Sequence, residues 1–199
     1  MSNIVVSEFI TLDGVIEGPG EEPGFDRAGW AFQFDRGAEG NTFKFEEIRA
    51  AGALLLGRVT YEGFAAAWPT MEGTGEFGEK MNGMPKYVVS KTLERAEWNN
   101  STIIRDNIPD EIRKLKARVD GDILINGSCG LVQTLIEHDL VDVYQLMIFP
   151  IVLGAGKRLF ATADAPSTLR LENIVKAGDT AILTYQPARA NGAAASDSL

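Results

Sequence analysis

The sequence predicts a single α/β domain with a mostly parallel central sheet, helices on both faces of the sheet and an antiparallel hairpin at the C-terminal end. Short apolar runs alternate with helix-periodic segments until about residue 137, which is typical of parallel strands joined by helical crossovers. After residue 140 strand patterns follow one another without helices, which indicates an antiparallel edge. The length of 199 residues suits one domain, expected at residues 1–187, and the Ala/Asn/Gly/Ser-rich segment 188–199 is expected to be disordered.

The strands are expected where β-branched and other apolar residues cluster between turn residues. In the alternating part they cover residues 4–10, 53–56, 85–90, 102–104 and 123–126. In the later part they cover residues 140–150, 169–175 and 180–185, and the last two are joined by a segment typical of a hairpin turn.

Helices are expected between these strands. Residues 41–51 have helical periodicity, with Phe45 and Ile48 on the inner face and Lys44, Glu47 and Arg49 outside. Further helices are expected from Gly57 to the Trp68-Pro69 pair, over residues 109–119, and from about residue 131. Residues 70–83 contain four glycines and are expected to form a mobile surface loop.

A long segment without periodicity, residues 11–40, contains seven glycines and two prolines. Loops of this length in a small domain are usually lids or binding loops. Within it Trp30, Phe32 and Phe34 alternate with polar or small residues, which is compatible with an edge strand or with apolar walls for a flat ligand.

The composition excludes several classes of function. The net charge of −9 argues against a nucleic-acid partner, because phosphate backbones are bound by basic surfaces. One cysteine and one histidine leave no disulfide and no evident metal-ligand set, so no metal is expected. No run approaches the roughly 18 apolar residues of a membrane span. The strand pattern begins by Asn3 and leaves no room for a signal peptide, so a cytoplasmic protein without a membrane partner is expected.

The segment 123–132 is the most informative for function. It indicates a buried strand, a glycine turn at Gly127 and Gly130, and the first turn of a helix, whose free N–H groups suit a phosphate. The alternative is a plain strand-to-helix turn. Three other predicted strand ends carry Gly, Ser, Thr or a cation, namely residues 11–16, 57–60 and 90–92. Ligands of open α/β sheets bind outside the carboxyl ends of the strands, so the four ends together suit a long anion with several phosphates.

Five stretches match the motifs of a known superfamily in their order along the chain. They are residues 7–18 (SEFITLDGVIEG), 54–64 (LLLGRVTYEGF), 87–92 (YVVSKT), 123–131 (ILINGSCGL) and 140–160 (LVDVYQLMIFPIVLGAGKRLF). The chain resembles the dihydrofolate reductase superfamily. It is most similar to the reductase domain at the C-terminus of the bifunctional riboflavin-biosynthesis deaminase–reductase and to its stand-alone bacterial relatives. The P-x-x-L-G-x-G-K-x-L-F pattern at 150–160 points to this branch.

This resemblance implies a dihydrofolate-reductase-like fold and an NADPH site at the four strand ends. Residues 12–16 would lie along the nicotinamide, Arg58 and Thr60 would hold the diphosphate, and Ser90 and Lys91 would meet the adenosine end and its 2′-phosphate. The residues expected to bind the cofactor are Leu12, Asp13, Gly14, Val15, Ile16, Gly57, Arg58, Thr60, Ser90, Lys91, Asn126, Gly127, Ser128, Cys129, Gly130 and Leu131.

The resemblance leaves the proton donor open. Aligning Phe45 with the family's helix Phe places Asn41 where classical folate reductases have their acid, and Asn cannot act as an acid. Aligning Trp30 with the family's loop Trp places Asp35 there instead. The Phe45 register is favoured because Gly57-Arg58 anchors it. The catalytic candidates are Asp35, Asn41 and Glu46, with Asp13 and Glu39 as further acids, and Trp30 and Phe45 are expected to contact the substrate.

The alternatives for these acids are structural. Asp35 would cap a helix, Glu46 would lie on a solvated helix face and Asp13 would shape its turn. Cys129 at a helix start is either reactive, with a lowered pKa, or a small buried packing residue.

The expected function is NADPH-dependent reduction of a small heterocyclic or ribose-linked substrate, with 5-amino-6-(5-phosphoribosylamino)uracil as the nearest example. The alternatives are a reductase of another imine, carbonyl or dihydrofolate-type substrate, and a dinucleotide-binding module that has lost catalysis. The resemblance also implies a homodimer that pairs through the late strands. The apolar run 143–153 suits such an interface or equally a central strand.

Overall fold

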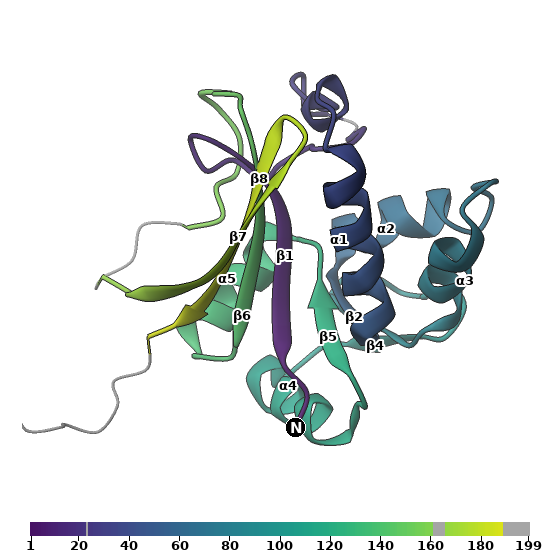
Figure 1. Cartoon of the computed structure of the whole chain (residues 1–199). Coiled ribbons are helices and arrows are strands. Elements are labelled where there is room, and N and C mark those ends of the chain that lie inside the picture. Colours follow the sequence, from purple (N-terminus) through teal and green to yellow (C-terminus); the bar gives the residue numbers. More distant parts are fainter. Residues whose placement is uncertain (23, 161–165, 189–199) are drawn as a thin grey trace, which may run out of the picture.

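A twisted eight-stranded sheet forms the middle layer of the fold (Figure 1). The computed structural model describes residues 1–22, 24–160 and 166–188. The strand order is β4-β3-β2-β5-β1-β6-β8-β7. The strands are β1 Ile4–Thr11, β2 Ala51–Gly57, β3 Lys86–Val89, β4 Ser101–Ile104, β5 Asp122–Ile125, β6 Val143–Phe149, β7 Leu169–Ala177 and β8 Thr180–Pro187.

The strands from β4 to β6 are parallel, whereas β8 runs antiparallel to β6 and β7 antiparallel to β8. The predicted fold class, including the C-terminal hairpin, is therefore confirmed. β6 lies between β1 and β8, so residues 143–149 form an inner strand of the sheet.

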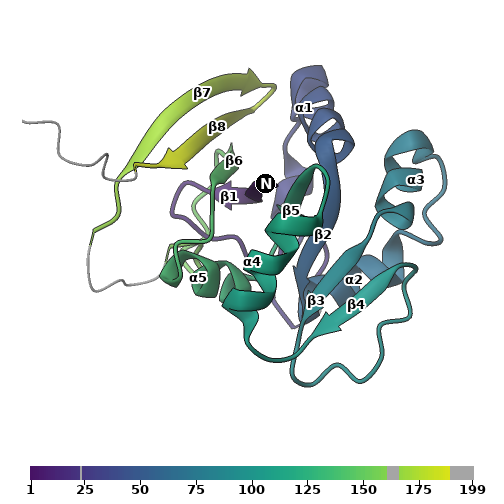
Figure 2. The ribbon, with the colours of Figure 1, turned by 90° about the horizontal axis from the view of Figure 1, so that it is seen from below.

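Helices cover both faces of the sheet, as the view from below shows (Figure 2). The helices are α1 Gly37–Ala50, α2 Arg58–Ala67, α3 Gly75–Gly83, α4 Ile108–Arg118 and α5 Cys129–Glu137. One apolar cluster joins Ile48, Tyr61 and Met81 of the first three helices to the sheet, and a second joins Leu115 of α4 and Leu135 of α5 to the opposite face. The burial of these two faces supplies the main driving force for the fold.

The prediction of a mobile loop over residues 70–83 is wrong, because α3 occupies most of this segment. Four glycines lower the helix propensity, but tertiary packing overrides it. Met81 is buried in the cluster with α1 and α2, and the Phe77 ring stacks on Trp68 with centroids 5.4 Å apart. The α1 helix also begins four residues before the predicted start, since the Asp35 carboxylate accepts a hydrogen bond from the Gly37 N–H (2.8 Å).

The edge-strand alternative for Trp30, Phe32 and Phe34 is also wrong. Residues Trp30–Gln33 form a short 3-10 helix, η1. The Trp30 indole is fully buried, packs edge-on against Phe149 of β6 at 5.3 Å between centroids, and donates its Nε1–H to the Glu17 carbonyl (2.8 Å). The Trp30 side chain is thus enclosed by protein and forms part of the core beneath the long loop, whereas the Phe32 side chain is 75% exposed.

No helix in the described ranges is long and apolar enough to cross a membrane. The predicted disordered tail lies outside the described residues, except for residue 188.

Candidate functional site

The candidate site lies where β1 and β5 separate at their carboxyl ends. The two strands pair from Ile4↔Ile123 to Val6↔Ile125 and not beyond. The chain leaves β1 toward α1 on one face of the sheet and leaves β5 toward α5 on the other face (Figure 2). Such a point, where helices depart to opposite faces, opens the crevice in which α/β proteins bind ligands.

Two turns from distant parts of the sequence interlock beside this crevice. A Cβ atom added to Gly57 would lie 2.0 Å from Ser128 Oγ, and one added to Gly127 would lie 2.8 Å from Thr60 Oγ1. Each turn therefore needs a glycine where the other approaches. The peptide bond between Gly127 and Ser128 is cis.

The interlocked turns border a cavity of about 310 Å³. It is lined by Gly57, Arg58, Val59, Val89, Ile108, Ser128, Gly130, Leu131 and Thr134. Five of these residues were predicted to bind the cofactor, so the structure brings the ends of β2 and β5 together as the sequence indicated.

Neither α2 nor α5 has a side-chain cap at its N-terminus. Side chains of the capping residues therefore do not satisfy the first N–H groups of these helices. The positive dipole ends of the two helices add to the positive charge of Arg58. The Arg58 side chain is exposed and forms an ion pair with Glu62 (2.8 Å). Nothing lies within 4 Å of a Cβ added to Gly130, so the start of α5 is open on that side. This donor set fits the diphosphate of a dinucleotide.

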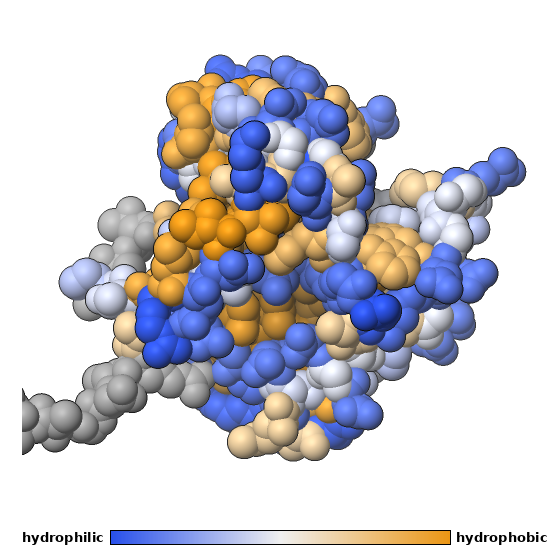
Figure 3. Space-filling view, viewed as in Figure 1, coloured by the Kyte–Doolittle hydropathy of each residue, from blue (hydrophilic) through white to orange (hydrophobic). Residues whose placement is uncertain are grey.

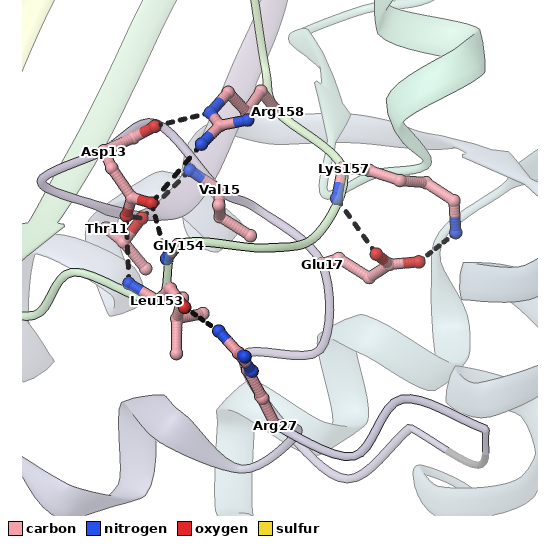
Figure 4. Close-up of polar contacts among 9 residues, drawn as sticks. All are labelled: Thr11, Asp13, Val15, Glu17, Arg27, Leu153, Gly154, Lys157 and Arg158. Carbon is pink, nitrogen blue, oxygen red and sulfur yellow. Dashed lines mark hydrogen bonds and ion pairs between the residues drawn. The ribbon is translucent and has the colours of Figure 1, made fainter.

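The predicted nicotinamide segment, residues 12–16, is held to the loop after β6 (Figure 4). Asp13 is the centre of the contacts. Its carboxylate accepts hydrogen bonds from Thr11 Oγ1 (2.7 Å) and from the N–H groups of Leu153 (3.1 Å) and Gly154 (2.8 Å), and Arg158 donates to the Asp13 carbonyl (2.9 Å). The Thr11 hydrogen bond is the largest of the effects that lower the pKa of Asp13 to about 2. Asp13 is therefore ionised at neutral pH and shapes this turn, which excludes it as a proton donor.

Two further contacts fasten the same pair of loops (Figure 4). Glu17 accepts from the Lys157 N–H (2.9 Å) and forms an ion pair with its ammonium, and Arg27 donates to the Leu153 carbonyl. Within the segment, Val15 and Ile16 are buried, whereas the Leu12 side chain is exposed. Leu12 is thus the residue of this segment that is most open to a ligand.

The predicted adenosine end lies after β3. The buried Ser90 hydroxyl accepts hydrogen bonds from the N–H groups of Thr92 (3.1 Å) and Leu93 (2.9 Å), so it shapes its own turn. Lys91 is exposed, and Arg105 donates to the Lys91 carbonyl (3.5 Å). Two cations, one of which the sequence did not single out, therefore lie at this corner.

Cys129 is buried, and its thiol lies 3.0 Å from the Arg158 carbonyl, where it donates a hydrogen bond. Burial, with a smaller effect of Glu8, raises the pKa of the thiol. The hypothesis of a reactive, low-pKa thiolate is therefore wrong, and Cys129 is a packing residue.

The catalytic candidates predicted on and before α1 are exposed, although Glu46 also lines the second cavity described below. Asp35, Glu39, Asn41 and Glu46 are all exposed. Asn41 accepts a hydrogen bond from Arg36 Nε (2.6 Å) and Glu46 pairs with Arg49 (2.6 Å). The Phe45 side chain is half-buried. None of these contacts leads to the crevice. Asp35 is not the N-cap of α1, which is Arg36, but its carboxylate accepts the N–H of the first residue of the helix.

The inner face of α1 instead carries two charged residues that were predicted to lie outside. The Lys44 ammonium donates to Ser7 Oγ of β1 (2.9 Å) and forms an ion pair with the buried Glu47. Lys44 and Glu47 are three residues apart and therefore lie on the same face of the helix. The prediction failed because it placed this face toward solvent, whereas in the structure it is turned toward the sheet.

A second cavity, of about 200 Å³, lies between α1 and the sheet. It is lined by Val5, Phe43, Glu46, Glu47, Ala50, Asp122, Leu124 and Gln145. Figure 3 shows a recess with an apolar floor on this face, at the level of β1, β5 and β6. Two buried acceptors among these residues, Glu47 Oε2 and Gln145 Oε1, have no hydrogen-bond partner. A ligand with N–H donors would satisfy both.

The crevice itself holds an acid that sequence reasoning missed. Glu8, in the middle of β1, is only 6% exposed, and its Oε1 accepts a hydrogen bond from the Gly127 N–H (2.6 Å). Asn126 Nδ2 donates to the Ser7 carbonyl alongside (3.0 Å), so side chains bridge the two strands where their ladder ends. Burial raises the pKa of Glu8 to about 8, although the Gly127 N–H and the Lys44 ammonium act in the opposite direction. The signal available in the sequence was an acid inside an apolar strand.

The sequence of this chain matches a known protein family. The family model described as the RibD C-terminal domain matches residues 2–183. The chain is 31% identical over 174 residues to the uncharacterized protein YyaP of Bacillus subtilis (strain 168), covering 85% of this chain and 86% of that protein.

Solved structures agree on the fold. A candidate riboflavin biosynthesis protein from Shewanella sp. PV-4 superimposes with a TM-score of 0.74 at 20% identity, covering 95% of this chain and 100% of the other. Dihydrofolate reductase from Enterococcus faecalis, in complex with NADP(H), gives a TM-score of 0.56 at 17% identity and covers 94% and 97%. From its motifs, its fold and the match over nearly all of its length, this chain belongs to the RibD C-terminal domain family.

Proposed function

We propose that this protein is an NADPH-dependent reductase of a pyrimidine-type, ribose-linked substrate related to 5-amino-6-(5-phosphoribosylamino)uracil. The observation that carries the proposal is the cavity shared by the uncapped N-termini of α2 and α5 beside the β1–β5 crevice. Membership of a reductase-like family supports the same reaction class.

Different residues of the chain would bind different parts of the cofactor and the substrate. Arg58 and the first N–H groups of α2 and α5 would hold the diphosphate, and Lys91 would meet the 2′-phosphate. Bound NADPH supplies a hydride. The heterocycle would lie beside residues 12–16, where the nicotinamide is expected, because hydride transfer needs the two reacting atoms about 3–3.5 Å apart.

Titration of the purified protein with NADPH, followed by nicotinamide fluorescence and by thermal stability, tests the cofactor. We expect saturable binding well below millimolar concentration. Assays of NADPH oxidation with the uracil compound, with dihydrofolate and with a simple imine then test the reaction. Absence of binding would refute the proposal, whereas binding without turnover of any compound would favour a dinucleotide-binding module.

We predict that Lys91→Glu weakens NADPH much more than NADH. The 2′-phosphate carries up to two negative charges, so a reversed charge beside it should cost about tenfold or more, or at least 1.4 kcal/mol. Binding of both cofactors would be measured by fluorescence, with Lys114→Glu on α4 as a control for the same change in net charge. Equal losses for NADPH and NADH would show that Lys91 does not meet the 2′-phosphate.

We also propose that the protein forms a homodimer through the C-terminal hairpin. β7 is the edge of the sheet, and its Leu171 and Ile174 side chains are exposed. An edge strand presents unpaired N–H and C=O groups with which the edge strand of a second copy can pair. Light scattering after gel filtration should give twice the chain mass of 21.6 kDa. Ile174→Asp should shift the protein to the monomer, and a wild-type monomer would contradict the proposal.

A further inference from the structure

The second cavity, under α1, lies toward the opposite end of the parallel strands from the proposed cofactor site. Its lining includes Val5, the second residue of β1, and Asp122, the first residue of β5. The first cavity, beside the interlocked turns, instead follows the carboxyl ends of β2 and β5, and the two cavities share no lining residue. The proposed cofactor, and a heterocycle beside residues 12–16, therefore leave the cavity under α1 without an assigned ligand.

The floor of this cavity is apolar and its wall is acidic. Val5 and Leu124 pair across β1 and β5, and both are buried. Glu46 and Glu47 of α1 and Asp122 of β5 contribute three carboxylates, and no lysine or arginine is among the described residues of the lining. Hydrophilic residues border the apolar floor in the surface view (Figure 3). Such a lining complements a small cation with an apolar body.

The protein itself compensates only part of this negative charge. Lys44 forms an ion pair with Oε1 of Glu47, and Glu46 pairs with an exposed arginine of the same helix. Asp122 accepts a hydrogen bond from the side-chain amide of Asn3 (3.2 Å), which is a neutral donor. A cation in the cavity would therefore be attracted by a carboxylate whose charge this neutral donor does not cancel.

Two oxygen atoms of the lining are buried and have no hydrogen-bond partner within the described residues. They are Oε2 of Glu47, whose side chain is only 4% exposed, and Oε1 of Gln145. The two side chains lie near each other, since Gln145 pairs with Ser7 across β6 and β1, and Ser7 Oγ accepts from the same Lys44 ammonium that pairs with Glu47. Because buried acceptors are normally satisfied, both oxygens point to a ligand that donates hydrogen bonds.

We infer that this cavity binds a small organic cation with an amidinium or guanidinium head and a compact apolar body. The inference goes beyond the proposed function and does not depend on it. The N–H groups of the head donate to Glu47 Oε2 and Gln145 Oε1, and the body covers Val5 and Leu124. A planar head with several N–H groups in fixed directions can donate to both oxygens at once. The volume of about 200 Å³ equals that of about seven water molecules in the liquid, so the ligand is about the size of one substituted ring.

Benzamidine, a planar amidinium on a single aromatic ring, is a suitable probe. Its binding to the purified protein would be measured by calorimetry and by amide shifts in ¹H–¹⁵N NMR spectra. We expect saturable binding with a Kd of about 1 mM or below, and the largest shifts at Val5, Leu124 and Gln145. Benzoate has the same shape and the opposite charge and should not bind at these concentrations. Benzamide, which keeps N–H donors without the charge, should bind about tenfold or more weakly.

Two substitutions test the location of the probe. Ala50 is exposed at the end of α1 and lines the cavity, so Ala50→Leu should obstruct the cavity and weaken benzamidine binding about tenfold or more without unfolding the protein. Ala66→Leu, at an exposed position of α2, is the matched control. Glu47→Gln removes the buried carboxylate and should cause a loss of similar size, whereas Glu79→Gln at an exposed position of α3 should cause none.

Several results would overturn the inference. One is the absence of saturable benzamidine binding in the millimolar range, and another is equal binding of benzamidine and benzoate. Unchanged affinity in Ala50→Leu, or shifts centred on Gly57 and Ser128, would place the probe outside this cavity. A ligand-free crystal structure in which the Gln145 amide donates to Glu47 would show that the two acceptors satisfy each other's environment. None of these measurements involves NADPH, so failure here is distinguishable from failure of the proposed function.

Discussion

Gly57→Ala is expected to lose both stability and cofactor affinity. The new methyl group would lie 2.0 Å from Ser128 Oγ and 2.8 Å from Ser128 Cβ, far inside contact distance. The backbone of Gly57 is extended, with φ −76°, so the cost is steric and does not come from an unusual dihedral angle. Forcing the two turns apart should lower the free energy of unfolding by about 1–3 kcal/mol.

The same displacement moves the N-termini of α2 and α5 away from each other. Since both border the cavity proposed to bind the cofactor, NADPH affinity should fall by about tenfold or more, which corresponds to at least 1.4 kcal/mol. Urea denaturation and fluorescence titration measure the two effects. Gly63→Ala on α2 is the matched control, because nothing lies within 4 Å of its added Cβ and alanine favours the helix.

A second substitution tests the cause. Ser128→Gly removes both atoms that the new methyl group would strike, and Ser128 makes no side-chain capping bond that would be lost. The double variant Gly57→Ala/Ser128→Gly should therefore recover most of the stability and affinity, with a clear coupling energy in the double-mutant cycle. If the single and double variants behave alike, the turns do not interlock as described.

Lys86→Met is expected to give the largest loss of stability in the part of the sheet next to α3. The Lys86 side chain is fully buried, and its ammonium donates to the carbonyls of Asn82 (2.8 Å), Met84 (2.9 Å) and Asn99 (3.0 Å). It also lies 4.2 Å from the centroid of the Trp98 ring, a cation–π distance.

Methionine matches the length of lysine but leaves three carbonyl groups without their donor. The free energy of unfolding should fall by about 3–5 kcal/mol, since buried hydrogen bonds to a charged group are worth about 1.5–3 kcal/mol each and part of the desolvation penalty of the charge is relieved. Lys114→Met is the control, because its ammonium forms an exposed ion pair with Glu111 (2.7 Å), and such pairs are worth about 0–1 kcal/mol. A change at Lys86 no larger than the control change would contradict the role of the buried ammonium.

The strands of this fold could be predicted from the sequence because each consists of a short β-branched or apolar run bounded by turn residues. Part of the lining of the first cavity could also be predicted, since Gly57, Arg58 and the 126–131 turn stand directly after such runs. By contrast, α3 could not be predicted, because its stability comes from contacts of Phe77 and Met81 with residues far away in the sequence.

The polar residues within apolar elements were the least predictable. Glu8 and Lys86 lie in strands, where alternation shows which residues share a face of the sheet but not what covers that face. Only the tertiary structure shows whether each buried polar side chain has a hydrogen-bond partner. Glu8 is buried because β5 leaves β1 after Ile125 and presents the Gly127 N–H to it. Lys44 and Glu47 were misplaced by a small error in the phase of α1, to which a helix of weak amphipathicity is sensitive.

The interlocked turns have a consequence for how the protein responds to its ligand. One turn follows β2 and the other follows β5, so neither half of the chain can form the cavity alone. Partly unfolded forms that open either half should have no affinity, and binding should protect amides of both halves from hydrogen exchange to a similar degree. Cofactor binding would thereby stabilise both halves of the sheet together. A higher cofactor concentration would lower the population of partly unfolded forms and so slow proteolysis of the chain.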